Sequence, residues 1–138
     1  MELPDPVVTV DELNRFLAEA FPHVPRGYAV ESLTDVGCRL RQPVDVTNTR
    51  PGGTISGPTL MGLADAAAWL ASLSRIGIVP LAVTSNLTIN FLAKPGLADL
   101  VADAELLRLS GRSSVTEVRI SSDHTLVAQA TVGYSIPA

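Results

Sequence analysis

Cysteine is nearly missing from this chain of 138 residues, because Cys38 is its only one. A single thiol cannot form a disulfide within the chain, and no companion residues give it the spacing of a metal site. We therefore expect Cys38 to be a buried thiol in a reducing compartment, and we expect no metal. Aromatic residues are also scarce, at 4%, yet hydrophobic residues reach 46%, which excludes a disordered chain.

Basic residues are few as well: ten Lys and Arg against 14 Asp and Glu give a net charge of −4. The chain therefore lacks the positive face that a nucleic-acid partner requires. Residues 1–6 have neither the basic nor the apolar region of a signal peptide, and the most apolar stretch is too short to cross a bilayer. We expect a soluble, cytoplasmic protein with no nucleic-acid or membrane partner, and its length predicts one domain over residues 1–138.

Several common motifs are missing too. A G-x-S-x-G nucleophile elbow is excluded because Ser56 stands one place late in the run from Gly53 to Gly57. Neither G-x-G-x-x-G nor a P-loop occurs anywhere in the sequence. The chain therefore lacks the usual elbow of serine hydrolases and the common nucleotide-binding signatures.

The hydrophobic pattern predicts two helices and six strands. Thr9 and Glu12 fit a capping box for an amphipathic helix over about residues 9–21. A longer apolar helix ends near Arg75, with Gly77 as its stop. Strands are expected at residues 28–33, 36–46, 81–92, 99–109, 113–120 and 126–136. The short turns between the last four predict antiparallel neighbours, so we expect an α+β domain whose sheet wraps around the long helix.

The long helix carries one carboxylate in its middle. Asp65 is flanked by Ala64 and Ala66, and it shares its face with Met61 and Trp69 at helical spacing. An Asp in the middle of a helix usually lies on a solvated outer face. This helix is apolar nearly all round, however, and a buried carboxylate needs a partner or a purpose. We therefore interpret Asp65 as a candidate catalytic base.

The start of this helix is the second candidate site. It follows the run Gly52-Gly53-Thr54-Ile55-Ser56-Gly57-Pro58, in which Pro58 fits the first helical position and Gly57 or Ser56 fits the N-cap. The free backbone N–H groups at a helix N-terminus can stabilise a developing oxyanion. A base and an oxyanion site together indicate acyl-transfer chemistry.

Two segments resemble one known family. The run from Gly57 to Ala67, GPTLMGLADAA, resembles the helix signature of hotdog-fold acyl-CoA thioesterases of the phenylacetic-acid-degradation type, in which His-Gly-Gly precedes Leu-Ala-Asp-Thr-Ala. The run from Ser85 to Gly96, SNLTINFLAKPG, resembles the family's strand ending in Phe-Leu-Arg-Pro. The resemblance covers about residues 28–137. It implies a hotdog fold, an acyl-CoA substrate with no separate cofactor, and a homodimer with sites between subunits, which can pair into a dimer of dimers.

The resemblance also implies roles for individual residues. Asp65 matches the catalytic acid, which serves as general base or nucleophile, and Gly57 matches the glycine whose N–H polarises the thioester carbonyl. Thr84 stands where some members have a serine that orients water. The chain departs from the family pattern at Ser56, which replaces the histidine, and at Pro58, which replaces the second glycine and has no N–H to donate.

Four residues are candidates for substrate binding. Arg50 aligns with a loop asparagine of the family, and its guanidinium can bind a carbonyl or an acyl carboxylate; an exposed surface arginine is the other interpretation. Asn48 is close to it in sequence, and Ser56 holds the histidine position. Trp69, one turn after Asp65, is expected to line the acyl pocket.

The spacing of the two catalytic candidates predicts a dimer independently of the family. Gly57 and Asp65 are eight positions apart, which is about 12 Å along a helix. Both must come within about 3 Å of one carbonyl or its attacking water. One helix cannot do this, whereas two antiparallel copies can.

Two competing functions remain open. One is an acyl-binding hotdog protein without activity. The other is an enoyl-thioester hydratase, but the helical Asp and His pair expected of a hydratase is missing, because residues 24–123 contain no histidine.

Overall fold

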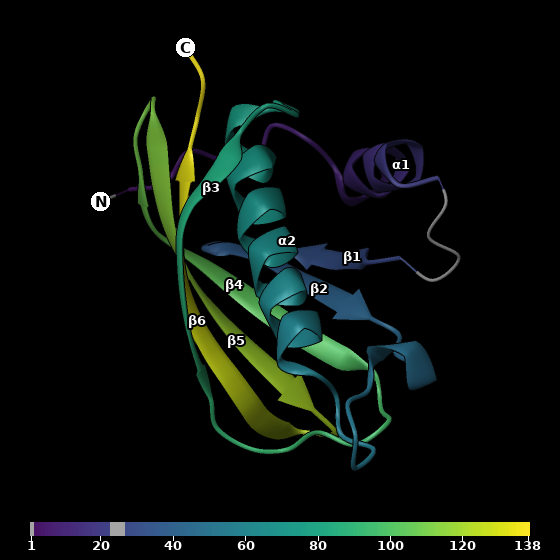
Figure 1. Ribbon diagram of the computed structural model, residues 1–138. Helices are drawn as coiled ribbons and strands as arrows, with labels where there is room; N and C mark the ends of the chain where they lie inside the picture. The colour runs from purple at the N-terminus through teal and green to yellow at the C-terminus, as the bar shows by residue number, and fades with distance from the viewer. Residues whose placement is uncertain (1, 23–26) are drawn as a thin grey trace.

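The computed structural model describes residues 2–22 and 27–138. Helix α2 (Gly57–Ile76) lies across the inner face of a six-stranded antiparallel sheet that curls around it, and helix α1 (Val10–Ala20) lies beside β1 (Figure 1). The strands are β1 (Ala29–Leu33), β2 (Gly37–Gln42), β3 (Val83–Phe91), β4 (Leu100–Leu109), β5 (Ser113–Ser122) and β6 (Thr125–Ser135), in the spatial order β1-β2-β4-β5-β6-β3. This architecture confirms the predicted α+β class with a sheet around one long helix.

Helix α1 begins at the capping box that the sequence predicts. Thr9 Oγ1 accepts a hydrogen bond from the Glu12 N–H, and Glu12 Oε1 accepts one from the Thr9 N–H, both at 3.1 Å. Its apolar face is buried through Leu13 and Leu17. The amide of Asn14 both donates to the Val30 carbonyl and accepts from the Val30 N–H, which fastens α1 to β1.

Ser56 is the N-cap of helix α2, and its side-chain oxygen accepts a hydrogen bond from the Thr59 N–H at 3.3 Å. Ser56 is one of the two predicted caps. Gly57 is the first helical residue and Pro58 the second, so the helix begins one residue earlier than the prediction that Pro58 is first. The difference is small because neither position has an intrahelical acceptor for its nitrogen. The helix ends at Gly77, whose φ of 93° is readily adopted only without a Cβ.

Small side chains allow the sheet to approach α2 closely. Leu63, Leu70 and Leu73 are fully buried and interleave with fully buried alanines at Ala64, Ala67, Ala68 and Ala71. The inward positions of β2, β4, β5 and β6 supply most of the rest of a single core, which α1 and β1 complete with Leu13, Leu17 and Val30. Cys38 belongs to it at 1% exposure, so the expectation of a buried thiol is confirmed. Among the described residues, no helix has the length and apolar character of a membrane span.

Strand β2 is shorter than predicted. The sequence pattern extends it to Val46, whereas the strand ends at Gln42 and a turn of 3-10 helix follows at Val46–Asn48. Pro43 explains the early end, because proline offers no N–H to a sheet ladder. Asp45 then caps the 3-10 turn by accepting from the Thr47 N–H at 2.8 Å. This turn leads the chain toward the start of α2.

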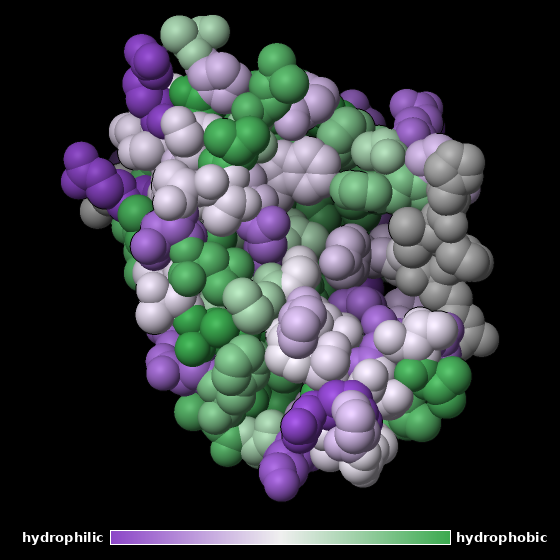
Figure 2. Space-filling view, viewed as in Figure 1, coloured by the Kyte–Doolittle hydropathy of each residue, from purple (hydrophilic) through white to green (hydrophobic). Residues whose placement is uncertain are grey.

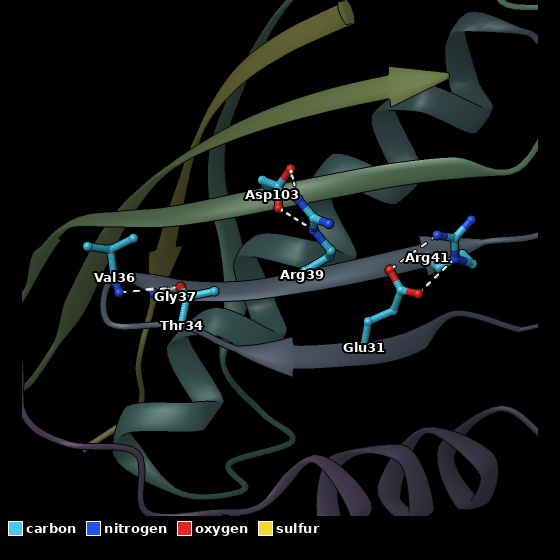
Figure 3. Close-up of polar contacts among 7 residues, drawn as sticks. All are labelled: Glu31, Thr34, Val36, Gly37, Arg39, Arg41 and Asp103. Carbon is cyan, nitrogen blue, oxygen red and sulfur yellow. Dashed lines mark hydrogen bonds and ion pairs between the residues drawn. The ribbon is translucent and has the colours of Figure 1, made fainter. Parts of the chain in front are cut away.

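Ion pairs cover the outer face of the sheet at the β1–β2 end (Figure 3). Arg39 pairs with Asp103 on β4 at 2.8 Å, and Arg41 pairs with Glu31 on β1 at 2.9 Å. All four side chains are substantially exposed, so each pair contributes little to stability. The β1–β2 turn is held from inside by Arg75 at the end of α2, whose guanidinium donates to the carbonyls of Thr34 and Gly37.

Strand β3 forms one edge of the sheet, since it pairs only with β6. It is long and largely exposed, and it carries Val83 and Phe91 at 57% and 53% exposure. Figure 2 shows hydrophobic surface along the side of the molecule where Figure 1 places this strand. An edge strand with unpaired backbone groups and exposed apolar side chains at both ends is a surface that proteins normally cover.

Candidate active site

Asp65 lies in the middle of α2, half-buried, beside the edge formed by β3 and β6. Two hydroxyl groups donate to the same carboxylate oxygen: Thr84 Oγ1 lies 2.5 Å from Asp65 Oδ1, and Tyr134 Oη lies 2.7 Å from it. Thr84 and Tyr134 are paired partners across the antiparallel ladder of β3 and β6, so both point toward the helix. The structure thus brings the predicted Thr84 to the predicted Asp65 and adds a tyrosine.

Tyr134 is the more enclosed of the two donors, at 4% exposure. Its hydroxyl also lies 3.2 Å from the Asp65 backbone carbonyl, so it faces both the side chain and the main chain of one residue. Burial raises the pKa of Tyr134, and the hydrogen bond to Asp65 with the negative charge there raises it further. Tyr134 therefore remains a protonated donor at neutral and mildly alkaline pH.

Tyr28, at the entrance to β1, is a third hydroxyl near the carboxylate. Burial raises its pKa, and the charge of Asp65 raises it further. Its hydroxyl would lie 3.4 Å from a Cβ added at Gly62, one helical turn before Asp65. A methyl group at position 62 would thus touch this hydroxyl at an ordinary contact distance, so Tyr28 lies directly against the helix at Gly62.

The two oxygens of the Asp65 carboxylate have different surroundings. Oδ1 accepts both hydroxyl donors, whereas Oδ2 accepts no hydrogen bond from any residue in ranges 2–22 and 27–138. A carboxylate fixed through one oxygen keeps the other available to take a proton from water or to attack a carbonyl carbon. The geometry therefore suits either catalytic role.

The start of α2 is tied to the preceding loop. The Ser56 N–H donates to the Asn48 carbonyl at 2.8 Å, and Thr59 Oγ1 donates to the same carbonyl at 3.3 Å. Ser56 Oγ meets Thr59 Oγ1 at 2.8 Å. The N–H of Gly57 donates to no backbone carbonyl in the described part of the chain. It belongs to the free donors at the positive end of the helix dipole.

The polar groups of the predicted substrate-binding residues are engaged to different degrees. The side-chain oxygen of Asn48 accepts from the Asp45 N–H at 3.0 Å, so it is committed to the local turn. Arg50 stands in a tight turn that its own carbonyl closes with the Gly53 N–H. The Arg50 side chain is exposed and forms no ion pair with any described residue.

Trp69 lies on the side of α2 that faces α1. Its ring packs edge-to-face with Phe16 at 5.3 Å and with Phe21 at 6.3 Å between centroids. Its Nε1 is buried and has no hydrogen-bond acceptor among the described residues. Helical spacing places Trp69 one turn from Asp65, yet its ring contacts are with α1.

One chain keeps Gly57 and Asp65 apart. Both belong to α2, as its first and ninth residues, and a rise of about 1.5 Å per residue separates them by about 12 Å along the axis. A Cβ added at Gly57 would lie 3.4 Å from the exposed ring of Phe91 at the end of β3, so this helix start adjoins the apolar edge of the sheet. In the described ranges, no three His, Cys, Asp or Glu side chains gather closely enough to hold a metal ion.

Sequence reasoning missed Tyr134 and Tyr28. Tyr134 occupies an inward position of β6, where alternation with Gly133 and Ser135 gives a weak signal of burial. Its pairing with Thr84 depends on the register between two strands about fifty residues apart, and on a bulge between Thr84 and Asn86. Nothing local in the sequence specifies that register.

Fold and site together define a class of protein. The sequence profile of the Thioesterase superfamily matches residues 52–129, more than half of the chain, and the chain belongs to this family. The match includes Gly57, Asp65 and Thr84, and the sheet around α2 is the hotdog fold. No match was found among curated proteins.

Many solved structures are similar to this chain, including these three. A protein from a Silicibacter species, described as a candidate thioesterase, is 34% identical with a TM-score of 0.87, covering 97% of this chain and 95% of its own. The phenylacetic acid degradation protein PaaI from Thermus thermophilus, solved as a mutant, is 27% identical with a TM-score of 0.71, covering 87% and 97%. A hypothetical thioesterase from Streptococcus pneumoniae, solved with coenzyme A, is 23% identical with a TM-score of 0.73, covering 81% and 87%.

Proposed function

We propose that the protein is an acyl-CoA thioesterase of the phenylacetic-acid-degradation type, which hydrolyses a thioester to a carboxylic acid and free CoA. The observation that carries the proposal is the half-buried Asp65 carboxylate, held on one oxygen by Thr84 and Tyr134 and open on the other. Family membership and the CoA-bound relative support the substrate, and the relative PaaI supports the type. The proposal includes a cytoplasmic location, in keeping with the single buried thiol.

In the proposed reaction, Asp65 takes a proton from water, the hydroxide adds to the thioester carbonyl, and the C–S bond breaks as CoA leaves and is protonated. The alternative route begins with attack of Asp65 on the carbonyl to form an anhydride, which water then hydrolyses. In both routes the Gly57 N–H, at the positive end of α2, stabilises the oxyanion. Loss of one such donor typically costs about 10²–10³ in rate.

The proposal requires a homodimer in which each Gly57 serves its partner's Asp65. A two-fold axis that pairs position 57 with position 65 also pairs Met61, midway between them, with its own copy. Met61 is an apolar side chain that is 41% exposed on α2, and the neighbouring β3 edge is apolar and exposed too. These surfaces support a shared interface, and the dimers can pair further into a dimer of dimers.

The dimer arrangement has a direct test. A Met61→Cys chain should give a covalent dimer with a short bismaleimide, because the two introduced thiols lie near the axis. Leu107→Cys is the matched control, since Leu107 is an exposed apolar residue on β4 that alternates with the buried Leu106 and so faces away from the core and α2, and Cys38 is buried in both variants. Equal cross-linking of the two variants would reject this axis.

The activity is tested by measuring free CoA released from a panel of acyl-CoA thioesters by the purified wild type and by Asp65→Asn. The amide keeps an oxygen for the donors at Oδ1 but cannot act as base. We expect turnover by the wild type and at least a tenfold loss in the variant. A protein that binds the thioesters without releasing CoA would be an acyl-CoA-binding protein, and hydration of enoyl-CoA in the same panel would identify a hydratase.

A further inference from the structure

A cleft of about 510 Å³ lies between α1 and the strands β1 and β2. Its walls are largely apolar and include Leu17 and Ala18 on α1 and Phe21 at the C-cap of that helix. Three polar side chains also border it: Asn14, Tyr28 and Gln42. This volume falls in the range of small-molecule sites. No element of the mechanism above uses it.

The cleft and the Asp65 carboxylate share one neighbour, Tyr28. Tyr28 lines the cleft, and its hydroxyl group lies against Gly62, one turn before Asp65. The negative charge of Asp65 contributes to the raised pKa of Tyr28. A thioester with its carbonyl at Asp65 therefore has this cleft within reach of its acyl group. The CoA portion must leave in another direction, because the walls that α1 contributes are mainly apolar.

Gln42 is a polar residue in an otherwise apolar inward row of β2. On β2 the inward row is Cys38, Leu40 and Gln42, of which the first two are at 1% and 0% exposure, while Arg39 and Arg41 face outward. Gln42 Oε1 is buried, with no hydrogen-bond donor among the described residues. Asn14, by contrast, has its amide satisfied by Val30. A buried acceptor without a donor is costly, so a ligand that brings a donor to Gln42 gains a hydrogen bond there.

We propose that this cleft binds the acyl group of the substrate, and that Gln42 selects an apolar acyl group ending in a neutral hydrogen-bond donor such as a hydroxyl. The inference rests on the proposed function for the identity of the thioester. The apolar walls bury the body of the acyl group, and the Gln42 amide, which borders the cleft, turns Oε1 from its buried position to receive the terminal O–H. An acyl group that lacks the donor leaves this acceptor unsatisfied, as it is in the free protein.

The test compares matched acyl groups with and without the terminal hydroxyl, such as hexanoyl and 6-hydroxyhexanoyl. Affinity is measured with non-hydrolysable CoA analogues, in which a CH₂ group separates the carbonyl from sulfur, and turnover is measured with the thioesters. We expect the wild type to bind the hydroxylated analogue about tenfold more tightly, as one buried hydrogen bond provides. In Gln42→Leu the preference should disappear or reverse. Leucine continues the apolar row of Cys38 and Leu40, so the variant should fold.

Gln129→Leu is the matched control, because Gln129 makes its hydrogen bonds with Asn90 and Glu117 on the outer face of the sheet. It should keep the wild-type preference. The inference is wrong if the wild type binds both analogues equally or neither, or if Gln42→Leu retains the preference. A binding preference for the hydroxylated analogue without any CoA release would reject the proposed hydrolysis but still support the proposed acyl site.

Discussion

Removing one hydroxyl tests how the carboxylate is held. Tyr134→Phe deletes Oη and leaves the ring that fills the core at 4% exposure. The lost hydrogen bond, 2.7 Å long, goes to an ionised acceptor. Hydrogen bonds to charged groups contribute about 1.5–3 kcal/mol. If all of that positions Asp65 for the transition state, kcat/KM falls by about tenfold to a hundredfold.

The readout should separate positioning from binding. Because Tyr134 touches Asp65 rather than the substrate, we expect kcat to fall with little change in KM. Thr84→Val should have a similar effect, since its hydroxyl donates to the same oxygen. Each single variant keeps one donor in place, so the double variant should lose more than the product of the two single losses. The CoA-release assay measures all four enzymes.

Tyr28→Phe provides the comparison, because no hydrogen bond joins its hydroxyl to Asp65 in the described residues. Its effect on kcat should be smaller than that of Tyr134→Phe. Full activity in Tyr134→Phe, with wild-type thermal stability, would refute the view that this hydroxyl holds the catalytic carboxylate. Independent effects in the double variant would show that the two donors do not share one task.

Three further outcomes follow from the structure. Burial raises the pKa of the Cys38 thiol from 9.0 to about 12, so the folded state holds this proton more tightly than the unfolded state does. The free energy of unfolding, measured with urea, should therefore fall as the pH rises from 9 toward 12. The fall should be less steep in Cys38→Ala. Ser56→Ala removes the N-cap of α2 and should lower the free energy of unfolding by about 1 kcal/mol in the same assay at neutral pH, against no change for the exposed Ser135→Ala. Arg50→Lys should reorder the preferred acyl-CoA substrates in the turnover panel while leaving the melting temperature unchanged. The reason is that only the planar guanidinium binds a carboxylate through two parallel bonds. An unchanged order would mean that Arg50 is an exposed surface arginine with no role in substrate choice.

The sequence predicted the fold well where local signals and pattern agreed. The Thr9–Glu12 capping box, the Gly77 stop and the alternation in β4 to β6 are each readable within a few residues. The end of β2 at Gln42 was less readable, because the apolar pattern continues through Val44 and Val46 while Pro43 already ends the ladder.

The site was predicted in part. Asp65 and Gly57 could be named as candidates because helix periodicity and N-terminal capping are local properties, and Thr84 became a candidate through the family resemblance. Tyr134 was not found, since its place beside Asp65 depends on the register of β6 against β3. Trp69 was expected at the acyl pocket from its spacing alone, whereas the position of α1, with Phe16 and Phe21, determines what its ring touches.

The central claim is that Gly57 of one subunit and Asp65 of the other act on one thioester, and mixing two inactive chains tests it most directly. Asp65→Asn keeps a good Gly57. Gly57→Val keeps a good Asp65, while the valine side chain blocks the approach of the thioester to the N–H at position 57; its added Cβ meets the exposed Phe91 ring at an ordinary contact distance. After subunit exchange, each mixed dimer should have one intact site of two and release CoA at about half the wild-type rate. Mixed dimers that are shown to form and stay inactive would contradict the account.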